Sequence, residues 1–102
     1  MILKINMLKR IVKLSIENEK KQLFIDLFAS NKNYIEKFKG CKSVELVQDV
    51  NQKNIFFTLS IWDNEDALNN YRNSDLFKGI WSKTKTFFCD KPQAWSLEKI
   101  SQ

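Results

Sequence analysis

The sequence has no histidine, only two glycines and only two cysteines, and each scarcity excludes a class of site. Without histidine, the chain lacks the usual general base at neutral pH and the commonest metal ligand, so histidine-dependent triads are excluded. Gly40 and Gly79 stand far apart and cannot form the glycine-rich loop that holds a nucleotide phosphate. Cys41 and Cys89 form no CxxC pair, which argues against structural zinc and iron–sulfur sites. We therefore expect no metal and no cofactor.

Long apolar runs are missing as well. No segment approaches the roughly 18 consecutive apolar residues of a membrane span. The opening MILKIN contains Lys4 and is shorter than the apolar run of ~7 to 15 residues in a signal peptide. These absences predict a cytoplasmic protein with reduced thiols and no membrane partner. Because Met7 is an alternative start, residues 1–7 are expected to form an N-terminal extension or the start of the first strand.

Basic residues outnumber acidic ones, 17 against 12, giving a net charge of +5. The charges are interleaved, however: Lys37 and Lys39 follow Glu36, and Lys13 is followed by Glu17. An anionic polymer needs a clustered basic surface, so this mixture predicts a solvated surface and no nucleic-acid partner.

Apolar residues make up 43% of the chain and include eight phenylalanines and three tryptophans. A chain of 102 residues forms one domain with a modest core. We therefore expect part of this apolar surface to line a ligand cavity or to contact a second subunit.

Hydrophobic periodicity predicts the order of the elements. Residues 8–16 alternate as a strand, with Arg10 unexpectedly on the apolar side, and residues 17–40 carry apolar residues at helical spacing up to Gly40. Residues 41–50 and 54–62 alternate as two further strands, and residues 93–100 as a last one.

A broken helix is predicted between the third and fourth strands. Asp63 or Asn64 can cap its first part, and Ser74 or Asp75 can open a second part whose apolar spacing continues to Phe88. The acids of residues 63–66 are explained by their place in the first turn of this helix.

The order strand, helix, strand, strand, broken helix, strand is the split βαβ pattern of a ferredoxin-like α+β domain with a four-stranded antiparallel sheet. The helices cover one face of the sheet. The other face, apolar from Ile55 to Ile61, needs a cover, which predicts a homodimer through the open sheet face. RNA-recognition modules share the strand order, but NIFFTLSIW has no glycine and favours burial over base stacking.

The stretch after the third strand carries a family pattern: a strand ending in tryptophan, a short acidic helix with an aromatic near its end, then a serine, an acid and a phenylalanine opening a longer helix. Together with GCKSVEL after the first helix, it resembles the antibiotic biosynthesis monooxygenase domain of dimeric α+β barrel proteins. The resemblance covers residues 8–100 and leaves residues 101–102 as a tail. The matching residues are Trp62, Glu65, Ala67, Leu68, Tyr71, Arg72, Ser74, Asp75 and Phe77.

The resemblance implies a dimeric α/β barrel with a pocket between helices and sheet. In such a pocket some relatives oxidise polycyclic phenols or quinols with molecular oxygen, without metal or flavin, and the deprotonated substrate supplies the electrons. Trp62 matches a pocket tryptophan implicated in catalysis, and Tyr71 or Arg72 corresponds to a tyrosine and an arginine that some relatives place near the substrate. Haem-degrading relatives need a histidine on the following helix, where this chain has Trp81, which argues against haem chemistry.

Several other residues have both a structural and a ligand-binding interpretation. Arg10 is either a strand-end side chain that reaches water or an anion partner in the pocket. Asn31 is either a polar gap in a long helix or a hydrogen-bond donor to the ligand. Phe28, Phe77 and Trp81 are expected to be core residues that also form the wall of the pocket.

Tyr71 is a better candidate for proton transfer than any carboxylate of the chain, provided that Arg72 or Arg10 lowers its pKa from about 10. Two functions follow. The first is a cofactor-independent monooxygenase acting on a small aromatic or quinol-type substrate, with Trp62, Tyr71 and Arg72 as catalytic residues. The second is a non-catalytic dimeric protein, small-ligand-binding or stress-associated, that uses the same pocket.

Overall fold

The computed structural model describes residues 7–100, and the expectations for residues 1–6 and for the tail at 101–102 lie outside the described residues. The strands are β1 (Leu8–Ser15), β2 (Cys41–Gln48), β3 (Ile55–Trp62) and β4 (Gln93–Glu98). The helices are α1 (Lys21–Glu36), α2 (Glu65–Arg72) and α3 (Asp75–Thr84), joined by the short 3₁₀ turns η1 (Asn18–Lys20) and η2 (Lys85–Phe87). None of the helices within residues 7–100 is long and apolar enough to cross a membrane.

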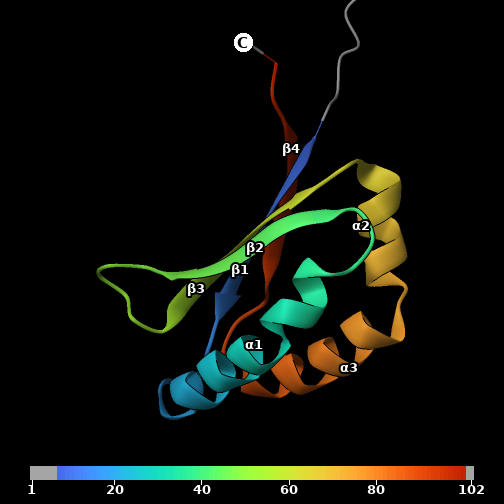
Figure 1. Ribbon diagram of the computed structural model, residues 1–102. Helices are drawn as coiled ribbons and strands as arrows, with labels where there is room; N and C mark the ends of the chain where they lie inside the picture. The colour runs from blue at the N-terminus through green and yellow to red at the C-terminus, as the bar shows by residue number, and fades with distance from the viewer. Residues whose placement is uncertain (1–6, 101–102) are drawn as a thin grey trace, which may run out of the picture.

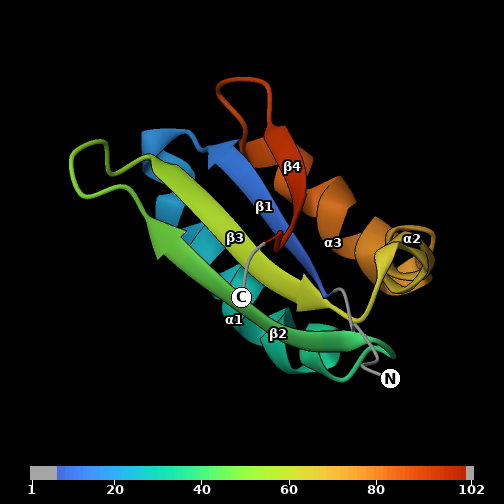
Figure 2. The ribbon, with the colours of Figure 1, turned by 90° about the horizontal axis from the view of Figure 1, so that it is seen from above.

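The strands form one antiparallel sheet in the order β2-β3-β1-β4. Figure 1 shows α1 and α3 side by side on one side of this sheet, and Figure 2 shows the strands in front of the helices. The predicted α+β ferredoxin-like architecture is therefore confirmed.

Short polar side chains begin the two later helices. The Asn64 side chain accepts a hydrogen bond from the Ala67 backbone N–H at 2.9 Å and caps α2. The Ser74 hydroxyl accepts one from the Phe77 N–H at 3.2 Å and caps α3. Each satisfies a backbone donor that the first turn of a helix leaves free, so the alternatives Asp63 and Asp75 are not the caps.

Two helices are shorter than their apolar spacing predicts. The first ends at Glu36 rather than at Gly40, because the chain turns there and the Phe38 N–H binds the Ile35 carbonyl. The last ends at Thr84, and Phe88 instead forms a β-bridge with Ile16. Pairing with the sheet thus overrides helical periodicity at residue 88.

The two faces of the sheet differ in burial. The face under the helices holds the largest buried side chains, among them Phe56 and Trp62, each 1% exposed. On the opposite face the central residues Ile11 and Leu59 are half-buried, and Trp95 is 43% exposed. Among residues 7–100, no helix covers this open face.

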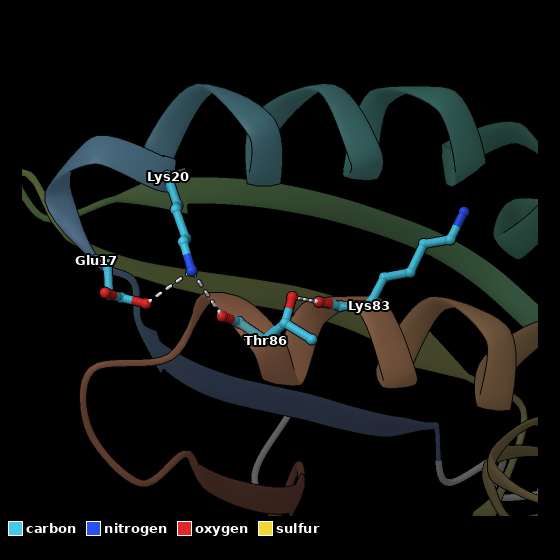
Figure 3. Close-up of polar contacts among 4 residues, drawn as sticks. All are labelled: Glu17, Lys20, Lys83 and Thr86. Carbon is cyan, nitrogen blue, oxygen red and sulfur yellow. Dashed lines mark hydrogen bonds and ion pairs between the residues drawn. The ribbon is translucent and has the colours of Figure 1, made fainter.

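Figure 3 shows how the beginning of α1 is tied to the end of α3. Lys20 Nζ lies 3.1 Å from a carboxylate oxygen of Glu17 and donates to the backbone carbonyl of Thr86 at 3.3 Å. The Thr86 hydroxyl donates in turn to the carbonyl of Lys83 at 2.7 Å. These groups are exposed, and pairs of this kind contribute about 1 kcal/mol or less.

Candidate functional site

A cavity of about 290 Å³ lies between the sheet and the helices. Its floor comes from the helix-facing residues of the sheet, its walls come from all three α-helices, and Pro92 and Ala94 border it where β4 begins. Most of the lining is aliphatic or aromatic, which suits an apolar, flat ligand.

The structure brings most of the predicted site residues together around this cavity. They come from five elements, β1, α1, β3, α2 and α3. The predicted residues that line it are Arg10, Phe28, Trp62, Tyr71, Arg72, Phe77 and Trp81.

Asn31 is the exception, because it lies outside the lining. Its side-chain amide donates to the Leu27 carbonyl at 2.8 Å, one turn earlier in α1. This hydrogen bond satisfies the amide within its own helix, as polar side chains inside helices often do. The structure therefore gives no support to the expected contact between Asn31 and a ligand.

Trp62 is held rigidly at the end of β3. Its indole N–H donates to the Ser60 hydroxyl at 2.9 Å, and its ring stacks on Tyr71 with centroids 4.9 Å apart and an interplanar angle of 30°. The side chain is 1% exposed and lines the cavity, so it is a core residue that also forms part of the cavity wall. The N–H already has an acceptor, so Trp62 contributes shape and apolar surface to the site rather than a free donor.

Ser60 was not among the sequence-predicted site residues. It lies two residues before Trp62 and therefore on the same face of β3, where it lines the cavity and is buried. A serine two positions before a buried tryptophan in a strand is the signal that points to it.

Tyr71 joins the tryptophan to the rest of the aromatic wall. It contacts Trp62 on one side and Phe77 on the other, with ring centroids 5.2 Å apart in an edge-to-face arrangement. Phe77 then stacks on Trp81 at 5.7 Å. The result is a continuous aromatic wall along α2 and α3.

The condition under which Tyr71 could act as a base, a pKa lowered by Arg72 or Arg10, is not met. Burial, assisted by the nearby Cys41 thiol, raises the pKa of Tyr71 far above its usual value. The phenol therefore keeps its proton at physiological pH and cannot act as the base. It makes no hydrogen bond within residues 7–100, which leaves its O–H as a donor for a ligand.

This raised pKa predicts a pH dependence of stability. Above about pH 10 the unfolded chain releases the Tyr71 proton while the folded chain retains it, so the contribution of Tyr71 is complete below that pH and is lost as pH rises. Between about pH 9 and about pH 11, the free energy of unfolding of the wild type should fall by about 1 kcal/mol more than that of Tyr71→Phe. Urea denaturation at both pH values measures this difference.

The exposed Tyr34 supplies the matched control, because its side chain is 65% exposed. Tyr34→Phe should follow the wild type at both pH values. If Tyr71→Phe also followed the wild type, burial would not be holding the proton on Tyr71.

Comparison with protein-family models places this site in a known context. The model described as antibiotic biosynthesis monooxygenase matches residues 7–81, most of the chain. The chain belongs to the antibiotic biosynthesis monooxygenase family. The resemblance drawn from Trp62 to Phe77 is thereby confirmed, and the match extends from the start of β1 to Trp81.

Solved structures of similar fold support the architecture of this family. A conserved protein from Methanosarcina mazei Go1 is 23% identical, with a TM-score of 0.88 over 93% of this chain and 94% of that one. A putative antibiotic biosynthesis monooxygenase from Nitrosomonas europaea is 10% identical, with a TM-score of 0.88 over 98% and 96%. One from Caulobacter crescentus CB15 is 18% identical, with a TM-score of 0.87 over 94% and 92%. At these identities the likeness shows the fold alone. A search of curated proteins found no match.

Arg10 gives the antibiotic biosynthesis monooxygenase fold a polar group in the floor of its cavity. It is half-buried on β1, directly opposite Ser60 on β3 and Ser96 on β4, and its guanidinium donates to the Ser96 hydroxyl at 2.9 Å. Burial, and then repulsion from Arg72, lower the pKa of Arg10. The guanidinium nevertheless stays charged at neutral pH.

Acidic groups do not take part in this site. Neither aspartate nor glutamate lines the cavity. Within residues 7–100 there is also no cluster of three or more histidine, cysteine, aspartate or glutamate side chains that could hold a metal ion. The groups available for chemistry are two guanidinium cations, hydroxyl groups and aromatic rings.

Proposed function

We propose that the protein is a cofactor-independent monooxygenase that oxidises a small aromatic or quinol-type substrate with molecular oxygen in this cavity. The observation that carries the proposal is the aromatic cavity beside Trp62, with cations and no carboxylate in its lining, in a member of this family. At about 290 Å³ the cavity is near the lower end of the range of ligand sites, roughly 300–1,000 Å³, which favours two or three fused rings.

The reaction balances without a cofactor. In an anthrone, a CH₂ group and O₂ give a C=O group and water. One oxygen atom bonds to the carbon, both C–H bonds break, and the second oxygen atom leaves as water with the two hydrogens. The substrate supplies all the electrons, so the protein has to favour its ionised form, orient it and exclude water.

We assign roles to the predicted catalytic residues from this geometry. Arg72, with Arg10, favours the substrate anion, because an adjacent positive charge lowers the pKa of an acidic group, and the substrate releases its proton to solvent water before the ring system is enclosed. Tyr71, whose proton is retained, donates a hydrogen bond to a substrate or product oxygen. Trp62 provides an apolar surface that holds the flat ring system of the substrate in place.

Oxygen consumption tests the proposed activity. The purified protein should consume oxygen with the anthrone dithranol or with a reduced naphthoquinol faster than the solution without protein. Trp62→Phe should lower this rate about tenfold, the change that about 1.4 kcal/mol of lost transition-state stabilisation produces. An oxygen electrode measures both rates.

The control is Tyr34→Phe, which changes an exposed aromatic residue of α1 outside the cavity and should leave the rate unchanged. Rates equal to the protein-free control across a panel of anthrones and quinols would contradict the enzyme and leave the non-catalytic ligand-binding function.

We further propose that the protein is a homodimer through its open sheet face. Apolar residues lie in register across this face: Leu59 on β3 is opposite Ile11 on β1, which is opposite Trp95 on β4. Such a patch is unusual on a monomer and suits a symmetric interface in which the same surface is used twice.

A further inference from the structure

Arg10 and Arg72 are the only arginines of the sequence, and both line the same cavity. They come from different elements, β1 and the last residue of α2. Every other basic residue is a lysine, and none of the lysines within residues 7–100 lines this cavity. Since the planar guanidinium matches a carboxylate with two parallel hydrogen bonds and an ammonium does not, this placement points to an oxyanion.

Neither arginine is neutralised by the protein. Within residues 7–100, neither forms an ion pair, and no acidic side chain reaches the lining. The single side-chain hydrogen bond of Arg10, to Ser96, occupies one of its five N–H donors. Two like charges in the lining of one largely apolar cavity repel each other, and an anion bound by both relieves this repulsion.

The neighbours of Arg10 fix its direction. Ser60, Arg10 and Ser96 form a row across three adjacent strands, and the two serines are the side chains directly opposite the arginine. The Ser60 hydroxyl accepts from Trp62, and the Ser96 hydroxyl accepts from Arg10. The cavity is therefore divided into a polar end at this row and an aromatic wall along α2 and α3.

We infer that the ligand of this cavity is an aromatic carboxylate, with its carboxylate held by Arg10 and Arg72 and its ring system against Trp62 and Tyr71. This inference rests on the proposed function for placing the substrate in the cavity, and it narrows the substrate class from neutral quinols to aromatic acids. Ser96 is a positioning residue, because it touches the guanidinium and not the ligand.

Binding of a matched pair of probes tests the inference. 2-Naphthoate and its neutral isostere 2-naphthamide share the same rings, and calorimetric titration measures the affinity of the folded protein for each. The wild type should bind naphthoate about tenfold or more tightly than naphthamide, as expected for hydrogen bonds to a charged group. Arg10→Met should abolish this preference, chiefly by weakening the binding of naphthoate.

Two further variants separate an effect on the carboxylate site from an effect on folding or on the charge of the surface. Arg72→Gln changes an exposed residue, so it remains informative if Arg10→Met does not fold, and it should also reduce the preference. Lys78→Met removes an exposed positive charge of α3 outside the cavity and should retain the preference in full.

Equal affinities in the wild type, a preference that survives both arginine substitutions, or no binding of either probe would overturn the inference. Its failure is distinguishable from failure of the proposed function. A protein that prefers naphthoate but consumes no oxygen with dithranol or with 1,4-dihydroxy-2-naphthoate, a quinol that carries a carboxylate, keeps the carboxylate site and loses the monooxygenase. A protein that consumes oxygen with these substrates but shows no preference for naphthoate keeps the monooxygenase and loses the carboxylate site.

Discussion

Gly40→Ala is expected to lower the free energy of unfolding by about 3 kcal/mol, which is a large fraction of the stability of a small domain. Gly40 has φ = +90°, a conformation that residues with a side chain avoid. A Cβ at this position would also overlap the Cβ of Ala67 in α2. The backbone strain at residue 40 and the overlap with Ala67 add, because neither can be relieved unless the start of β2 or the helix α2 moves.

The position of Gly40 connects this cost to the site. Its carbonyl accepts a hydrogen bond from the Asp63 N–H at 2.8 Å, so the start of β2 is held against the segment that leads from Trp62 into α2. Displacing α2 would move Tyr71 and Arg72 away from the cavity. We therefore expect Gly40→Ala to reduce ligand binding as well as stability.

The other glycine supplies the control. Gly79 lies exposed in α3, and a Cβ there would meet no atom within 4 Å. Gly79→Ala should stabilise the protein by about 0.5–1 kcal/mol, because alanine is the better helix former and reduces the freedom of the unfolded chain. Urea denaturation compares the two variants with the wild type. A Gly40→Ala variant with the wild-type midpoint would contradict the close approach of Ala67.

The strands and their order along the chain could be predicted from the sequence, because the patterns that indicate them are local. Alternation along β1 and β3 and the short polar residues before α2 and α3 each reflect neighbours within a few positions. Helix ends were predicted less well, since Phe88 continues the helical spacing of α3 but pairs with Ile16. That pairing depends on a segment far away in the sequence.

The residues of the candidate site likewise divide into those that the sequence indicated and those that only the fold brings together. The resemblance located Trp62, Tyr71, Arg72 and Phe77, whereas Ser96 stands in no sequence pattern and Ser60 is marked only by its place two residues before Trp62. Those serines gain their importance from the register of the sheet.

Tyr71 shows why an electrostatic expectation can fail when the positions are correct. The sequence places Arg72 next to Tyr71, but the degree of burial decides the direction of the pKa shift. Burial is a property of the packed fold. A phenol that keeps its proton changes the proposed role of Tyr71 from a base to a hydrogen-bond donor.

Leu59→Lys is expected to convert the protein from a dimer to a monomer. Leu59 is half-buried at the middle of the open sheet face, opposite Ile11 on one side and Glu45 on the other. A lysine there can pair with Glu45 across the strands, so the substitution should not lower the stability of the sheet within a single chain. In a dimer, the same charge would be removed from water inside an apolar interface, which costs several kcal/mol.

Light scattering coupled to size exclusion measures the outcome. The wild type should show about twice the monomer mass of 12.1 kDa, and Leu59→Lys should show the monomer mass with an unchanged circular dichroism spectrum. Leu23→Lys is the matched control, because Leu23 is 57% exposed on α1, away from the sheet, and its substitution should leave the mass unchanged. A wild-type mass of one chain would contradict the dimer. In that case the apolar row from Leu59 to Trp95 would need another cover, because a patch of this kind seldom stays exposed on a monomer.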